Sequence, residues 1–226
     1  MYGHGMNDVE GMPEQPRLRD YVAWHRAYDD PASSLSARLR QVQGHIADWL
    51  DRTPGAVRVL SACAGQGHDI LGVLEERPSD RARVSGALVE LDPTNAAIAR
   101  ARTARLGLDI SVLERDAGTT DSYIGLVPAD LVLLSGIMGN ITAEDIERLV
   151  HVSRQLCAPG ATVIWTRGAQ EPDLGPDIRC WFAETGFGEV SCDEWIEGTG
   201  MRVGVERLDA DPEPLVPGHR IFTFTR

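Results

Sequence analysis

The chain has 226 residues, a formal net charge of −12, 42% hydrophobic residues and 25% charged residues. This composition is typical of a globular chain with a sizeable core, and the excess of acids argues against nucleic acid, which is bound through clustered basic residues. No run approaches the roughly 20 apolar residues of a membrane-spanning helix, and the first residues lack the basic start and apolar middle of a secretory signal, so we expect no membrane partner.

The first 54 residues precede the regular part of the pattern. Residues 1–17 combine glycines, prolines and acids without periodicity, which predicts a flexible tail. Residues 18–54 are predicted to form an N-terminal helical cap or lid. Apolar residues recur there at steps of three and four, which indicates an amphipathic helix that Ser33 or Ser34 can cap. These apolar positions are Leu35, Leu39, Val42, Ile46 and Leu50.

Residues 55–226 alternate between strand and helix patterns. The expected strands cover residues 57–62, 83–91, 108–115, 130–136, 161–167, 187–195, 201–208 and 220–226. The expected helices cover residues 67–76, 93–107, 142–160 and 177–186. Such alternation predicts parallel βαβ units, and therefore an α/β domain with a doubly wound, Rossmann-like sheet.

The first strand-to-helix turn reads SACAGQGHD, from Ser61 to Asp69. Ligands of doubly wound sheets bind beyond the carboxyl ends of the strands, where this turn should lie. Gly65 and Gly67 permit positive φ and a close approach of the backbone to a ligand. Glycines in such a turn also occur without a ligand, so the turn alone leaves a purely structural reading open.

The second strand ends in LVELDP, which places Glu90 about 25 residues after the glycine turn. An acid near this spacing accepts hydrogen bonds from both hydroxyls of a ribose. The alternative is that Glu90 caps the next helix. Asp92 is better placed for that cap, so we assign Glu90 to the ribose.

Together with these features, ERDA after the third strand and DLVLLSGIMGN in the fourth resemble class I S-adenosylmethionine-dependent methyltransferases over residues 55–226. The resemblance implies a seven-stranded sheet in the order 3-2-1-4-5-7-6, with strand 7 antiparallel. The first motif of that family usually reads acid-x-Gly-x-Gly-x-Gly. Here Ser61 replaces the acid and Cys63 the first glycine. Asp69, Asp29 or Asp30 could supply the missing charge opposite the ammonium of the cofactor.

The resemblance also implies which residues bind S-adenosylmethionine and its product S-adenosylhomocysteine. Glu90 would bind the ribose and Leu91 would lie against the adenine. Asp116 would accept from the adenine amino group, beside the backbone N–H of Ala117. Ser135 and Gly136 would flank the methionine portion. The full set is Ser61, Ala62, Cys63, Gly65, Gly67, Asp69, Glu90, Leu91, Asp116, Ala117, Ser135 and Gly136.

The acceptor side is harder to assign. In the resembling family the segment before strand one often folds over the cofactor, which makes His25 and Tyr28 the candidates for a catalytic role. The alternative is that aromatic side chains merely pack this segment down. The loop after strand four and the end of strand five provide candidate substrate-binding residues, for each of which core packing is the alternative. These residues are Met138, Asn140, Trp165 and Arg167.

Other chemistries fit the sequence less well. A dinucleotide-binding turn would have glycine where Ile70 stands, which disfavours an NAD-binding oxidoreductase. The four cysteines and six histidines show no zinc spacing, so we expect no metal. Isolated cysteines are typical of a reducing compartment.

We therefore predict a cytoplasmic methyltransferase, monomeric or homodimeric, that transfers a methyl group to a small molecule by in-line displacement. The alternatives are the NAD-binding oxidoreductase and a methyltransferase-like binding subunit without catalysis.

Overall fold

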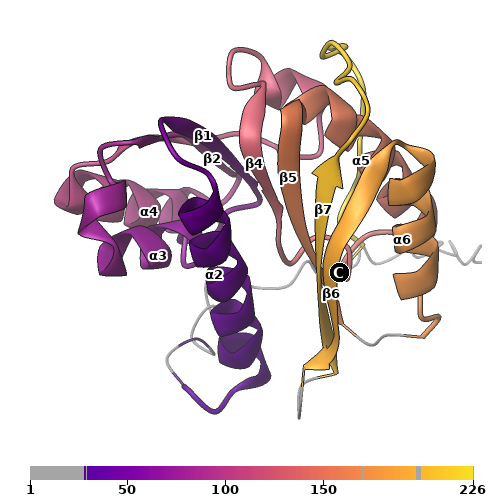
Figure 1. The fold of residues 1–226 in the computed structure, drawn as a ribbon, viewed down its shortest axis with the longest axis horizontal. Helices are drawn as coiled ribbons and strands as arrows, with labels where there is room; N and C mark the ends of the chain where they lie inside the picture. Colours follow the sequence, from indigo (N-terminus) through magenta and orange to yellow (C-terminus); the bar gives the residue numbers. More distant parts are fainter. Residues whose placement is uncertain (1–27, 29, 169–170, 197–199, 226) are drawn as a thin grey trace, which may run out of the picture.

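A computed structural model describes residues 28, 30–168, 171–196 and 200–225 of the chain. Its seven strands form one sheet in the order β3-β2-β1-β4-β5-β7-β6, which confirms the predicted order (Figure 1). Strands β1 to β5 pair in parallel, whereas β7 is antiparallel to both β5 and β6. The strands are β1 (Val57–Ala62), β2 (Val84–Glu90), β3 (Asp109–Glu114), β4 (Ala129–Leu134), β5 (Cys157–Gly168), β6 (Phe187–Ile196) and β7 (Met201–Leu208).

Helices cover both faces of the sheet (Figure 1). Successive side chains of a strand point to opposite faces, so β1 sends Val59 to one apolar cluster and Leu60 to the other. The first cluster includes helices α2, α3 and α4, and the second includes α5 and α6. The helices are α2 (Ser34–Arg52), α3 (Ile70–Glu76), α4 (Pro93–Leu106), α5 (Ala143–Leu156) and α6 (Gly175–Glu184); short 3-10 turns cover Pro78–Asp80 and Thr120–Tyr123.

Side-chain caps fix where helices α2, α3, α4 and α5 begin. The Ser33 hydroxyl accepts from the N–H of Ser36 and starts α2. The Asp92 carboxylate accepts from the N–H of Asn95 and starts α4, and Thr142 starts α5 in the same way. Each cap satisfies an N–H that has no partner inside its helix. The predicted capping roles of Ser33 and Asp92 are therefore confirmed.

Side-chain hydrogen bonds join helix α2 to the turn between β1 and α3 and to strand β6. Near the glycine turn, the Gln43 side chain donates to the backbone carbonyl of His68 at 2.8 Å. At the other side of the face, the Asp193 carboxylate of β6 accepts from Gln41 at 2.6 Å and lies 2.5 Å from His45 Nε2. These contacts set the position of α2 over the first strand-to-helix turn.

The predicted strand over residues 220–226 is wrong. Arg220 makes one isolated bridge to Thr119, and the residues that follow it, up to 225, belong to no strand. The N–H of Ile221 donates to the carbonyl of Gly118, and the N–H of Thr225 donates to that of Asn140. The apolar side chains of this segment are thus buried although its backbone bonds to loops and does not pair in the sheet.

Candidate functional site

The turn between β1 and α3 takes an unusual backbone conformation at alternate residues. Cys63, Gly65 and Gly67 have φ of +50°, +55° and +68°. L-residues rarely adopt this left-handed region, and a non-glycine residue there is strained by roughly 1–2 kcal/mol. Cys63 is thus a non-glycine residue in a conformation that favours glycine. The pKa of its thiol is raised well above the usual range, first by burial and then by the charges of Glu90 and Asp116.

Glu90 ends β2 beside this turn and holds it in place. One carboxylate oxygen accepts from the N–H of Gly65 at 2.7 Å, and the other accepts from the N–H of Asp92 at 2.8 Å. Hydrogen bonds to a charged acceptor are about twice as strong as neutral ones. Glu90 is only 9% exposed, yet it lines a cavity, so it orders the turn and also faces the space where a ligand would lie.

Asp116 follows β3 and has two partners. One carboxylate oxygen accepts from the N–H of Gly118 at 2.8 Å. The other lies 2.6 Å from the guanidinium of Arg220, which comes from the segment after β7. The sequence analysis did not foresee this ion pair, because the two residues are 104 positions apart.

The sheet ends surround a cavity of about 430 Å³, which is within the range of small-molecule sites. It lies beyond the carboxyl ends of β1, β2, β3 and β4, as expected of a doubly wound sheet. The residues that these strand ends and α4 contribute are Cys63, Ala64, Gly65, His68, Asp69, Glu90, Leu91, Asp92, Pro93, Asn95, Asp116, Ala117, Ser135 and Gly136.

The opposite wall comes from the segment before β1 and from the C-terminal residues. It consists of Tyr28, Arg38, Leu39, Val42 and Phe224. Arg38 is 7% exposed and donates to the Tyr28 hydroxyl at 2.7 Å. Arg38 was not among the predicted site residues, although its place in the sequence carries a signal. Arg38 lies three residues after Leu35 and four before Val42, so it interrupts the apolar stripe of the amphipathic helix.

Two buried polar groups of the cavity wall have no hydrogen-bond partner among the described residues. They are the hydroxyl of Ser135 and the side-chain N–H group of Asn95, whose carbonyl oxygen accepts from Gln66. An unsatisfied buried polar group costs about 1–3 kcal/mol. A polar ligand in the cavity could satisfy both groups, so this wall suits a polar ligand better than an apolar one.

Most of the predicted cofactor-binding residues line this one cavity, but three do not. Ser61 and Ala62 are each 1% exposed within β1. Gly67 faces the core, where an added Cβ would come within 2.6 Å of Leu71. These three residues lie on the core side of the turn, away from the cavity. Among the acids considered for the missing charge, Asp69 lines the cavity, Asp30 is exposed and caps the N–H of Ala32, and Asp29 lies outside the described residues.

Of the predicted acceptor-side residues that the structure describes, Tyr28 lines the cavity and the others do not. Met138 and Trp165 are 0% exposed and belong to the core, and neither lines the cavity. Arg167 is also buried and donates to the backbone carbonyls of Met138 and Pro172, which joins the loops after β4 and β5. Asn140 donates to the carbonyl of Gly136 within its own loop. His25 lies outside the described residues.

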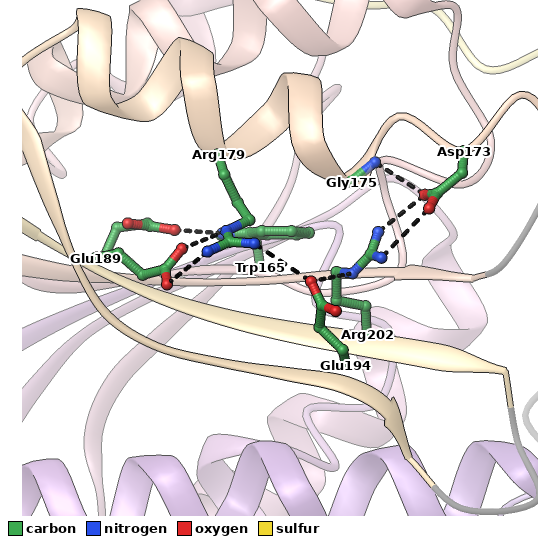
Figure 2. Close-up of polar contacts among 8 residues, drawn as sticks. Trp165, Asp173, Gly175, Arg179, Glu189, Glu194 and Arg202 are labelled. Atoms are coloured by element: carbon green, nitrogen blue, oxygen red, sulfur yellow. Dashed lines mark hydrogen bonds and ion pairs between the residues drawn. The ribbon is translucent and has the colours of Figure 1, made fainter.

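Trp165 packs beneath α6 in a charged surrounding (Figure 2). Its ring stacks on Phe182 with centroids 6.2 Å apart. Above it, Arg179 of α6 pairs with Glu189, and Glu194 lies between the guanidinium groups of Arg179 and Arg202. This network fastens α6 to the β6–β7 hairpin. Packing of the core, the alternative that the sequence left open, accounts for the burial of Trp165.

No three His, Cys, Asp or Glu side chains lie together as metal ligands would in the part of the chain that the structure describes. No described helix combines the length and apolar character needed to span a membrane.

No family model matches the sequence, and a search of curated proteins finds no match. Solved structures, in contrast, are similar over most of the chain. The CurJ carbon methyltransferase superposes with a TM-score of 0.63 at 15% identity, over 84% of this chain and 59% of that one. The magnesium protoporphyrin IX methyltransferase (ChlM) of Synechocystis PCC 6803, solved with bound S-adenosylmethionine, gives 0.63 at 14% identity, over 83% and 90%.

A family 2 O-methyltransferase from Planctomyces limnophilus, in complex with apigenin, gives a TM-score of 0.58 at 18% identity, over 77% of this chain and 59% of that one. The chain thus spans 59% of the length of this structure and of CurJ. At these identities the likeness concerns the fold. The fold is that of the class I S-adenosylmethionine-dependent methyltransferases.

Proposed function

We propose that the protein is an S-adenosylmethionine-dependent methyltransferase that acts on a small-molecule acceptor. The proposal rests on the cavity at the carboxyl ends of the strands. This cavity combines a left-handed glycine turn, the Glu90 carboxylate, and the partnerless polar groups of Ser135 and Asn95. It lies where the methyltransferase fold binds its cofactor.

The residues present fit this cofactor. Glu90 would accept from the ribose hydroxyls while it keeps its bonds to the turn. Leu91, which is 63% exposed, would cover the adenine. Asp116 would accept from the adenine amino group, with Ala117 beside it, and Arg220 would hold that carboxylate in position. Ser135 and Gly136 would flank the methionine portion.

Bound S-adenosylmethionine would supply an electrophilic methyl group. The chain would align the acceptor with that group and exclude water from the cavity, which is where most of the rate acceleration would come from. Tyr28 lines the cavity. Burial raises the pKa of its hydroxyl, and the smaller, opposing effect of Arg38 does not cancel this rise. Its hydroxyl would therefore stay protonated, so Tyr28 would position an acceptor rather than remove its proton.

A small acceptor fits a cavity of about 430 Å³ that α2 lines on one side. The excess of acids in the chain disfavours nucleic acid. Two of the similar structures are consistent with such an acceptor, since one contains apigenin and another is named for magnesium protoporphyrin IX. All four cysteines are free, as in proteins of a reducing compartment, and we propose the cytoplasm. A monomer or a homodimer remains the prediction.

Calorimetric titration with S-adenosylmethionine, S-adenosylhomocysteine and NAD tests the proposal. We expect the first two to bind with micromolar affinity and NAD not to bind. Binding of NAD without a response to S-adenosylmethionine would instead support an oxidoreductase. Mass spectrometry of a panel of small phenols, amines and carboxylic acids then tests turnover. Cofactor binding without methylation of any compound would support a binding subunit.

A further inference from the structure

The cavity has a second charged end, which lies where α2 faces the glycine turn. We propose that Arg38 and Asp69 together bind the amino-acid end of the cofactor, with Arg38 opposite its carboxylate and Asp69 opposite its ammonium. This inference rests on the proposed function. It assigns the recognition of the zwitterion to a helix before β1 and to the end of the turn, because β1 itself has Ser61 where the fold family has an acid.

Arg38 is built to face the cavity. It is 7% exposed on the apolar side of α2, between the cavity-lining residues of that helix and Tyr28. The Tyr28 hydroxyl accepts from one guanidinium nitrogen at 2.7 Å, which fixes the direction of the side chain. A planar guanidinium suits a carboxylate partner because it can donate two parallel hydrogen bonds.

Asp69 is equally buried, at 8% exposure, and lines the same cavity. Its carboxylate accepts from the N–H of Ile70 at 2.7 Å and caps α3. Burial raises the pKa of this carboxyl, and the charges of Arg102 and Arg38 partly oppose the rise. The ring of Tyr28 lies with its centroid 4.9 Å from that of His68, the residue before Asp69. Asp69, Arg38 and Tyr28 therefore share one end of the cavity.

The charges of the cavity match those of the cofactor. Among the described residues that line it are one guanidinium, that of Arg38, and the four carboxylates of Asp69, Glu90, Asp92 and Asp116. S-adenosylmethionine carries two positive groups, the sulfonium and the ammonium, and one carboxylate. A mostly acidic cavity with one cation thus complements a mostly cationic ligand with one anion. Glu90 and Asp92 are held at the ribose side by their backbone bonds, which leaves Asp69 for the ammonium.

Variants and truncated ligands can be combined to test this inference. Calorimetry would compare S-adenosylhomocysteine with 5′-methylthioadenosine, which lacks the whole amino-acid end, and with the analogue that lacks only the amino group. We expect Arg38→Met to weaken binding of S-adenosylhomocysteine at least tenfold and of 5′-methylthioadenosine less than twofold. Asp69→Asn keeps the helix cap. We expect it to weaken binding of S-adenosylhomocysteine at least tenfold but to change the affinity for the analogue without the amino group less than twofold.

Arg40→Met is the matched control, because Arg40 lies on the same helix and donates to the carbonyl of Pro31 instead. It should leave both affinities unchanged. Equal losses for long and truncated ligands in Arg38→Met would show that Arg38 only supports the fold, and no loss at all would remove it from the site; either result overturns the inference. If the unmodified protein bound neither adenosine ligand, the proposed function would fail first, and the inference with it.

Discussion

Replacement of Glu206 by glutamine should make the protein more stable at neutral pH. Glu206 lies on β7, is 1% exposed, and accepts from the indole N–H of Trp165 at 3.2 Å. Burial raises the pKa of its carboxyl from 4.5 to about 7; the indole hydrogen bond and Arg179 oppose this rise, and Glu189 adds to it. Glu206→Gln keeps an oxygen for the indole N–H and removes the ionisation.

The raised pKa of Glu206 determines how stability depends on pH. The folded protein holds the proton of Glu206 more tightly than the unfolded chain, so folding stability falls as the pH rises from 4.5 to about 7 and then levels off. At 1.36 kcal/mol for each pH unit, the full penalty is about 3.4 kcal/mol, an upper bound because local water and relaxation of the fold screen the charge. We expect Glu206→Gln to raise the free energy of unfolding by about 2–3 kcal/mol at pH 8 and by almost nothing at pH 4.5.

Urea unfolding followed by tryptophan fluorescence at several pH values between 4.5 and 8.5 measures the difference between the two proteins. The exposed Glu147 of α5 provides the control, and Glu147→Gln should change the unfolding free energy by less than about 0.5 kcal/mol at every pH. A difference for Glu206→Gln that does not depend on pH, or that grows toward acid, would show that Glu206 does not carry a penalty for ionisation.

Four further substitutions test the site and its surroundings. Glu90→Ala should weaken S-adenosylmethionine binding by about 1.5–3 kcal/mol in calorimetry, and an unchanged affinity in a folded variant would remove Glu90 from the site. Gly65→Val should abolish that binding, because a branched side chain at φ +55° is strained and fills ligand space; Gly107→Val, at φ +66° after α4, is the matched control that should lose stability only. Cys63→Gly should raise the unfolding free energy by about 0.5–1 kcal/mol by relieving the left-handed strain, and a clear loss would show that the thiol packs favourably. Trp165→Ala should cost about 3–5 kcal/mol of stability and leave the cofactor affinity of the folded protein unchanged, whereas a loss of affinity alone would return Trp165 to the site.

Features with a local cause could be predicted from the sequence. Alternation of short apolar strands with helices indicated the α/β class, because the periods of strand and helix are written into neighbouring residues. The caps Ser33, Asp92 and Thr142 lie within three residues of the N–H groups that they satisfy. The glycine turn and Glu90 were recognisable because a parallel sheet always brings the ends of its first two strands to the same edge.

What depends on distant residues was decided by the tertiary structure. The ion pair of Asp116 with Arg220, and the meeting of Arg38 with Asp69 across one cavity, join segments that no local pattern relates. Trp165 could have faced a ligand or the core, and only the packing of α6 over β5 buries it. Residues 220–225 have apolar side chains that would suit a strand, yet their backbone groups bond to loops instead. Apolar patterning reports which side chains leave water, and only the assembled sheet decides what they are buried against.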